Sequence, residues 1–335
     1  MKKFSILLLI IIFIIVVCFF IIGDYVYRTG TKVSCNVHSY HIVNSPHEFF
    51  TPDIGNGPFK GKGWNKWVNF DLSSWWLKKD ITFEKIKIEE NNSSIELIGW
   101  WIPATYPEKK QTVIVVHGIN TNRQDFNVLM PATFLANNGF NVLLFDLRDH
   151  GESTCEDGRH SAGQLEALDI LSAVNWLKTN KGISQKNIGI HGISGGAIAT
   201  LVVTAKNSQI AAFSLESPIF DFNKAAEDEV KWQGFPGFLW TAAYYAARIR
   251  GVNLVEVSSA DGINNLKGRP MQVFHGTQDS RVNYQNSLDL VKYAKSKGLN
   301  IKLHSFKNAD HTEALLTETE RYASELTQFF NVLYK

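Results

Sequence analysis

A serine between glycines is the first feature of this chain that could do chemistry. Gly192-Ile193-Ser194-Gly195-Gly196 follows a short apolar stretch and precedes apolar residues with helical spacing. A G-x-S-x-G pattern between a strand and a helix is typical of a strained turn that lifts a serine hydroxyl above a sheet. A side chain at Gly192 or Gly196 would collide with the neighbouring strand or helix. The pattern predicts that Ser194 is a nucleophile.

A serine hydroxyl needs a base within hydrogen-bond reach and a carboxylate that orients the base. In chains with this turn the acid and then the histidine follow the serine. Asp279 follows an expected strand at 270–274, and His311 follows another at 300–305. Loops after parallel strands meet at one edge of the sheet. We predict that Asp279 orients His311, which deprotonates Ser194.

Other acids and imidazoles fit these roles less well. Asp310 is the main alternative acid, but its position next to His311 makes a productive hydrogen bond awkward. Four histidines lie within or at the ends of expected strands, where we expect structural roles: His117, His191, His275 and His304. The charged loop after the 141–145 strand is interpreted as a brace, with Arg148 paired to Asp149, and not as the source of a catalytic His150.

A tetrahedral intermediate also needs hydrogen-bond donors for its oxyanion. We expect one donor to be the backbone N–H of Gly195, directly after the nucleophile. The other should come from the loop that follows His117-Gly118. Ile119 is the preferred donor there, and Asn120 is the alternative.

Along most of the chain, apolar runs of strand length alternate with segments of helical pattern. Alternation of this kind implies a mostly parallel sheet with helices on both faces. The expected strands are 81–88, 95–102, 112–116, 141–145, 187–191, 211–215, 270–274 and 300–305, and the expected helices include 123–137, 162–178 and one after Ser194. Residues Asn91-Asn92-Ser93 predict a hairpin turn between the first two strands.

Two regions depart from this alternation. An aromatic-rich stretch at about 218–268 is too long for a plain loop, and we expect a small helical lid, with an ordinary pair of edge helices as the alternative. Residues 24–80 combine glycines and tryptophans, and we treat them as a linker or N-terminal segment before a single large domain at 81–335. Its tryptophans are expected to pack on that domain, although the bilayer interface is an alternative.

The N-terminal residues 1–23 predict a membrane anchor. The apolar run Ile6–Ile22, with Phe4 and Ser5, would make a helix of roughly 28 Å, close to the ~30 Å hydrocarbon core. A cleaved signal peptide is the alternative, but its apolar region is shorter and ends at a small-x-small site that Ile21-Ile22-Gly23 does not offer. Lys2 and Lys3 favour a cytoplasmic N-terminus and an extracytoplasmic domain on a single-pass protein.

Composition excludes several classes of protein. A formal net charge of +2 without long basic blocks gives no reason to expect nucleic acid as a partner. Three cysteines without CxxC spacing indicate neither a disulfide scaffold nor a metal ligand set. Cys35 and Cys155 could pair outside the cytoplasm, but we expect unpaired thiols.

Taken together, His117-Gly118, the Asp146–Ser153 loop, Gly192–Gly196, Asp279 and His311 resemble the α/β-hydrolase superfamily. More narrowly, the chain resembles bacterial membrane-anchored hydrolases of the serine-aminopeptidase-like group, and the segment Leu97–Pro103 fits that group's entry strand. The resemblance covers about residues 80–335. It implies a Ser-Asp-His triad at Ser194, Asp279 and His311 and no metal or other cofactor. Asp149 stands where many relatives have a small residue.

The expected activity is acyl transfer to Ser194 followed by hydrolysis. The aromatic insertion and the anchor favour a small-molecule or lipid-like substrate with an apolar acyl ester or thioester. A peptidase is the enzymatic alternative, and a non-catalytic binding protein on the same fold is the alternative from another class. The sequence leaves the natural substrate and the oligomeric state open.

Overall fold

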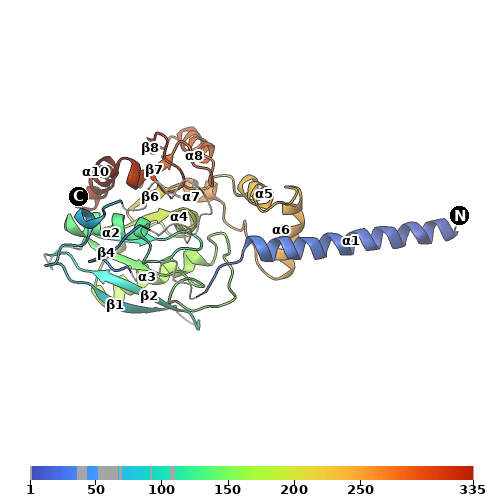
Figure 1. Cartoon of the computed structure of the whole chain (residues 1–335), viewed down its shortest axis with the longest axis horizontal. Helices are drawn as coiled ribbons and strands as arrows, with labels where there is room; N and C mark the ends of the chain where they lie inside the picture. Colours follow the sequence, from blue (N-terminus) through green and yellow to red (C-terminus); the bar gives the residue numbers. More distant parts are fainter. Residues whose placement is uncertain are drawn as a thin grey trace. The chain divides into compact units, whose positions relative to one another are not determined.

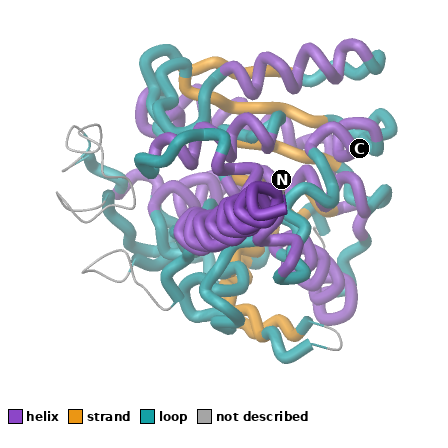
Figure 2. Tube along the Cα trace, turned by 90° about the vertical axis from the view of Figure 1, so that its right-hand side faces the viewer, coloured by secondary structure: helices purple, strands orange, loops and turns teal. Residues whose placement is uncertain are grey.

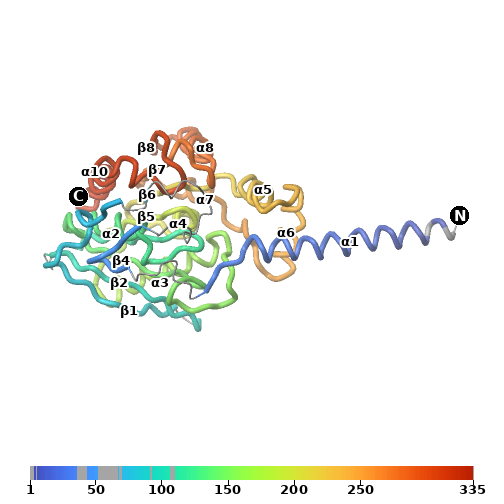
Figure 3. Tube along the Cα trace, viewed as in Figure 1, coloured from blue at the N-terminus to red at the C-terminus, as the bar shows by residue number. Residues whose placement is uncertain are grey.

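The computed structural model describes residues 2–35, 44–51, 67, 70–90, 93–105 and 110–334. An eight-stranded sheet in the order β1-β2-β4-β3-β5-β6-β7-β8 organises most of them. The strands are β1 (Glu84–Glu89), β2 (Glu96–Ile102), β3 (Thr112–Val116), β4 (Asn141–Phe145), β5 (Ile188–Ile193), β6 (Ala212–Glu216), β7 (Met271–Gly276) and β8 (Lys302–Phe306). Figure 3 shows β1 and β8 at opposite edges.

The sheet is parallel from β4 to β8, and β2 pairs antiparallel with both β1 and β4. The central strand β3 is Thr-Val-Ile-Val-Val and is buried at every position, as a strand covered on both faces requires. The edge strand β1 alternates instead, with Ile86 and Ile88 inward and charged residues outward. The hairpin between β1 and β2 was predicted correctly, although Asn91 and Asn92 lie outside the described residues.

Helices cover both faces of the sheet (Figure 2). One hydrophobic cluster joins the sheet to α3 (Glu166–Lys181), α4 (Gly195–Lys206), α7 (Ser259–Asn264) and α8 (Gln285–Ser296). A second cluster, on the other face, includes α2 (Phe126–Asn137), α9 (Ala314–Thr317) and α10 (Thr319–Phe330). Short 3-10 turns lie at η2 (Ser73–Trp75), η3 (Gln185–Asn187) and η4 (Asn331–Tyr334). This layered arrangement is the α/β-hydrolase fold that the sequence predicted.

The chain divides into two compact units, Met1–Lys32 with Asp221–Glu256 (unit 1) and Val33–Phe220 with Val257–Lys335 (unit 2). Unit 1 holds α1 (Lys2–Gly30), α5 (Phe222–Trp232) and α6 (Leu239–Ile249). Figure 1 shows α6 beside α1. Most of the expected insertion at 218–268 therefore shares a unit with the N-terminal helix, and α7 belongs to the sheet-containing unit.

Helix α1 is long and apolar enough to cross a membrane over Ile6–Gly30. Signal sequences also have such a helix, so this property alone does not distinguish an anchor from a cleaved peptide. The helix continues seven residues past the expected end of the anchor at Gly23, as far as Gly30.

Described residues of the 24–80 segment contribute to the core of unit 2. Phe49, Leu72 and Leu77 are buried in the second cluster, and the Trp76 indole donates to the Phe49 carbonyl at 2.8 Å. These contacts agree with packing on the domain. The glycines at 55, 57, 61 and 63 and Trp64, which prompted the linker prediction, lie outside the described residues.

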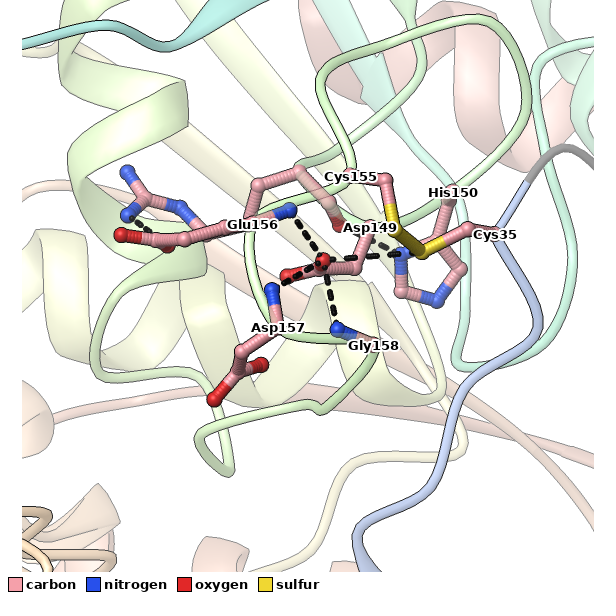
Figure 4. Close-up of a disulfide and its surroundings, with 8 residues drawn as sticks. Cys35, Asp149, His150, Cys155, Glu156, Asp157 and Gly158 are labelled. Carbon is pink, nitrogen blue, oxygen red and sulfur yellow. Dashed lines mark hydrogen bonds and ion pairs between the residues drawn. A yellow bond between two sulfur atoms is a disulfide. The ribbon is translucent and has the colours of Figure 1, made fainter.

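The expectation of unpaired thiols is wrong for two of the three cysteines. Cys35 and Cys155 form a disulfide with a Cα–Cα distance of 5.6 Å across 120 residues of chain (Figure 4). The bond fixes the segment that enters unit 2 to the loop after β4, where the Val33 N–H also donates to the Gly158 carbonyl at 2.8 Å. Cys18 is free and exposed on α1.

The disulfide can be tested by counting thiols and by measuring stability. Without reductant, denatured full-length chain should titrate with one thiol, Cys18, and reduction should raise the count to three. The Cys35→Ser, Cys155→Ser double variant should lower the free energy of unfolding by about 2–5 kcal/mol, because it releases a long loop in the unfolded chain. Cys18→Ser, the matched control, should leave stability unchanged. Three thiols before reduction would contradict the pairing.

Candidate active site

Ser194 lies on a strained turn between β5 and α4. Its backbone has φ 51° and ψ −112°, and its N–H donates to the Glu216 carbonyl at 2.8 Å. A Cβ at Gly192 would lie 2.5 Å from the Gly196 carbonyl oxygen, and a Cβ at Gly196 would lie 2.5 Å from the His117 carbonyl oxygen. Both flanking positions therefore require glycine, as the sequence predicted, because α4 starts directly against β5 and β3.

The structure brings Ser194, His311 and Asp279 together. His311 Nε2 lies 3.0 Å from Ser194 Oγ, and its Nδ1 lies 2.8 Å from Asp279 Oδ2. Each residue lies on a loop at the carboxyl end of a strand, after β5, β8 and β7. Asp310 contacts other groups: its carboxylate accepts from the N–H and hydroxyl of Ser280.

The Asp279 carboxylate is buried and saturated with donors. Oδ1 accepts the N–H groups of Arg281 and Val282 at 2.9 and 2.7 Å, and Oδ2 accepts the Ser217 hydroxyl at 2.9 Å. Burial alone raises the pKa of this carboxyl, but the charge on His311 and the hydrogen bond from His275 outweigh it, so the pKa lies well below its usual range. Asp279 therefore stays ionised beside the imidazole.

The two expected oxyanion donors lie side by side at the nucleophile. A Cβ on Gly195 would be 3.0 Å from the Ile119 nitrogen, and one on Gly118 would be 3.2 Å from Ser194 Cβ. Within the described part of the chain, neither the Gly195 nor the Ile119 amide donates a hydrogen bond. The Asn120 N–H is already used, because it donates to His150 Nε2 at 3.2 Å.

Two buried histidines that we expected to be structural fix the loop that carries Ile119. His150 Nδ1 lies 2.7 Å from the Arg148 carbonyl, so Nδ1 carries the proton and Nε2 accepts from Asn120. His117 bridges the same loop to the one after β4, through the Gly118 carbonyl and the Leu147 N–H. Burial lowers the pKa of both imidazoles, which favours the neutral, accepting form.

The predicted pairing of Arg148 with Asp149 is wrong. The Arg148 guanidinium instead contacts Asp169 at 2.7 Å and Glu90 and Glu156 at 3.1 Å. Asp149 Oδ1 accepts the N–H groups of residues 156, 157 and 158 (Figure 4), at 2.6, 3.0 and 2.9 Å. Three amides satisfy this oxygen without a cation, and the buried Oδ2 has no hydrogen-bond partner among the described residues. The loop is a brace, as expected, but is held by other partners.

One group of side chains among the described residues has metal-ligand spacing, and it consists of Cys35, Asp149 and Cys155. Both sulfurs are joined in the disulfide, so this group offers no thiolate ligand. The chemistry of its donor atoms does not fit a metal site.

A buried acid beneath the nucleophile was not anticipated. Glu216 ends β6 and is fully buried, and its Oε2 accepts the Tyr322 hydroxyl at 2.6 Å. The Tyr322 oxygen also lies 3.0 Å from His191 Nε2. Burial raises the pKa of the Glu216 carboxyl to about 7, against the opposing hydrogen bond from Tyr322. A glutamate in an apolar strand has no sequence pattern that reveals such a partner.

Glu216 makes stability depend on pH. Folded Glu216 keeps its proton up to about pH 7, whereas the unfolded side chain releases it near 4.5. Unfolding therefore releases a proton from Glu216 between these values. The contribution of Glu216 to the free energy of unfolding should fall as pH rises through this window, by about 3 kcal/mol. Glu216→Gln should remove most of this loss.

The measurement is denaturant unfolding of detergent-solubilised full chain at pH 5 and pH 8. Glu320→Gln, at an exposed position on α10, is the matched control and should keep the wild-type difference. Equal pH dependence in wild type and Glu216→Gln would show that Glu216 does not titrate in this range.

Two proteins of known name are similar in sequence to parts of this chain. "Inactive dipeptidyl peptidase 10" of Rattus norvegicus is 22% identical over 241 residues, covering 69% of this chain and 29% of that protein. "Lysophosphatidylserine lipase ABHD12" of Danio rerio is 24% identical over 206 residues, covering 60% of this chain and 52% of that protein. The chain thus spans under a third of the first relative and about half of the second.

Solved structures agree on the fold. The esterase Pf2001 of Pyrococcus furiosus superposes with a TM-score of 0.61 at 22% identity, covering 88% of this chain and 98% of that one. At the level of sequence families, residues 124–334, well over half of the chain, match the prolyl oligopeptidase family. This segment begins just before α2 and includes Ser194, Asp279 and His311. The chain is a hydrolase-fold protein and belongs to the prolyl oligopeptidase family.

Proposed function

We propose that this protein is a serine hydrolase that cleaves an ester or thioester with an apolar acyl group through an acyl-enzyme. The observation that carries the proposal is the position of the His311 imidazole, within hydrogen-bond distance of both Ser194 and Asp279. Membership of a hydrolase family supports the reaction class.

In the proposed mechanism, His311 Nε2 takes the Ser194 proton as Oγ attacks the acyl carbon. Asp279 accepts the Nδ1–H and stabilises the imidazolium, for which its low pKa suits it. The free amides of Gly195 and Ile119 receive the oxyanion. The imidazolium then protonates the leaving alcohol or thiol as the tetrahedral intermediate collapses to acyl-Ser194. Water, deprotonated by His311, attacks this acyl group and releases the acid.

The apolar character of the substrate rests on unit 1. The insertion between β6 and β7 is rich in aromatic residues and shares its unit with the apolar helix α1. One relative is named a lysophosphatidylserine lipase. We propose a lipid-like acyl substrate, with α1 as an uncleaved single-pass anchor and unit 2 on the extracytoplasmic side. The disulfide supports an oxidising compartment.

A peptidase is the second candidate, favoured by the family match and by the dipeptidyl-peptidase relative. An aminopeptidase-like activity, which the narrower resemblance suggested, falls within this alternative. A third candidate, from another class, is a non-catalytic binding protein, since one relative is named inactive. The imidazole contacts argue against this third reading.

Labelling distinguishes an enzyme from a binding protein. A fluorophosphonate should label full-length wild type at Ser194, and Ser194→Ala should not label. Ser194→Ala should also lower turnover by about 10³-fold or more. The matched control is Ser208→Ala, at an exposed position after α4, and it should label fully. Ser217→Ala is unsuitable as a control, because the Ser217 hydroxyl contacts Asp279. Absence of labelling in wild type would favour the binding protein.

A substrate panel separates esterase from peptidase. We expect p-nitrophenyl esters of medium or long chain to be turned over faster than aminoacyl anilides, because the proposed acyl site is apolar. Turnover of anilides alone, with a required free amino terminus, would overturn the ester proposal while leaving Ser194 as nucleophile.

His150 is proposed as a positioning residue for the oxyanion donors. His150→Leu removes the acceptor for the Asn120 N–H and should lower kcat about 10-fold or more, with little change in KM, because Ile119 loses its fixed orientation. His150→Gln restores an acceptor at the same reach and should recover most of the activity. Equal losses in both variants, or a change in KM alone, would contradict the role.

A further inference from the structure

The exposed face of α6 in unit 1 is the strongest feature that the proposed function does not use. Helix α6 packs on α1 at a very close approach, because a Cβ at Gly23 would lie 2.9 Å from Ala242 Cβ and 2.6 Å from its carbonyl carbon. Val26 and Tyr27 follow Gly23 at helical spacing and are also buried. Glycine and alanine at this crossing allow the two backbones to touch.

Three contacts show that α6 crosses α1. Phe235, before α6, makes an edge contact with Tyr25, the helix centre at Ala242 meets Gly23, and Arg250 after the helix contacts Asp24 at 2.6 Å. A helix of 11 residues is roughly 16 Å long. If α6 ran along α1, its two ends would contact positions about 11 residues apart on α1. Instead Phe235, four residues before α6, and Arg250, its C-cap, reach adjacent residues of α1. Figure 1 shows α6 running across α1.

The position of this crossing along α1 sets a depth in the bilayer. The apolar run of α1 ends at Ile22, and Gly23 to Tyr27 extend it by about 8 Å. The headgroup layer on each side of the hydrocarbon is about 5–8 Å thick. If α1 spans the membrane, α6 therefore lies at headgroup depth and runs across the spanning helix, close to the membrane plane.

The side chains of α6 suit that depth. Phe238, Tyr245 and Ile249 are 71%, 50% and 72% exposed, and their spacing places them on one face of the helix, next to Ala242. Arg248 and Arg250 are exposed at the end of α6, and the helix contains no acidic residue. Apolar and aromatic groups on one face with arginines beside them are typical of a helix that lies in a membrane interface.

We infer that α6 is an interfacial membrane helix, with Phe238, Tyr245 and Ile249 inserted at the boundary between headgroups and acyl chains. Arg248, exposed at the end of the helix, contacts anionic lipid headgroups. The inference rests on α1 as a membrane span and does not require that the protein be a hydrolase. The partner of the exposed face of α6 is then the bilayer. This helix of the insertion lies in the layer where a lipid-like substrate resides.

Depth-dependent quenching tests the inference. Single cysteines at Phe238, Tyr245 or Ile249 are made in full-length Cys18→Ser chain, with the Cys35–Cys155 disulfide kept, and labelled with an NBD fluorophore. The proteins are reconstituted in vesicles of phosphatidylcholine and phosphatidylglycerol that carry doxyl groups at shallow or deep acyl positions. Ile12→Cys on α1 reports on the span, and Leu288→Cys, 40% exposed on α8 in unit 2, is the matched apolar control. Circular dichroism of each variant checks that it is folded.

We expect blue-shifted emission and strong shallow-doxyl quenching at 238, 245 and 249, deep-doxyl quenching at 12, and no quenching at 288. Quenching at 12 but not on α6 would overturn the inference and leave the anchor intact. No quenching at 12 would overturn both. A blue shift on α6 without doxyl quenching, dependent on protein concentration, would identify a second copy of the chain as the partner and also overturn it. Fluorophosphonate labelling at Ser194 is read separately, so failure of the proposed hydrolase function cannot be mistaken for any of these results.

Discussion

The hydrogen bonds of one imidazole are the interaction on which the site depends. His311 must reach Ser194 with one nitrogen and Asp279 with the other, and these residues lie 117 and 32 positions from it in the chain. Parallel strands bring these three distant residues together, because the carboxyl ends of the strands meet at one edge of the sheet. Three further features hold the three side chains in place. Gly192 and Gly196 allow close packing, Ser194 has a strained backbone, and Asp279 is buried among hydrogen-bond donors.

Around this centre, neutral histidines hold backbone in place. The loop after β3 carries the Ile119 amide, and His150 and His117 tie it to the loop after β4. The same β4 loop is fixed further out by the three amides on Asp149 and by the disulfide. A continuous set of bonds thus runs from the point where the chain enters unit 2 to the oxyanion donors.

The sequence predicted what local patterns determine. Ser194, Asp279 and His311 could be placed because each follows an apolar strand, in the chain order that the fold requires, and the strands were found within a few residues of their observed bounds. Contacts that depend on tertiary structure were missed. Cys35 and Cys155 are 120 residues apart and meet only through the fold, and Asp149 binds amides that leave no trace in sequence. Glu216 and Ser217 lie beside the site for the same reason, as the end of a neighbouring strand.

The N-terminal helix and the insertion form one compact unit although about 190 residues separate them. Small residues at the crossing of α1 and α6 make that association close. The insertion could be predicted as helical from its sequence, whereas its packing on α1 depends on tertiary structure and was not predicted.

The most direct test of the central claim is a crystal structure of the full chain after reaction with a phosphonate acyl analogue. We predict a bond from phosphorus to Ser194 Oγ, a phosphonyl oxygen about 3 Å from the amide nitrogens of both Gly195 and Ile119, and His311 between the adduct and Asp279. An adduct on another residue, or a phosphonyl oxygen that points away from both amides, would contradict the account.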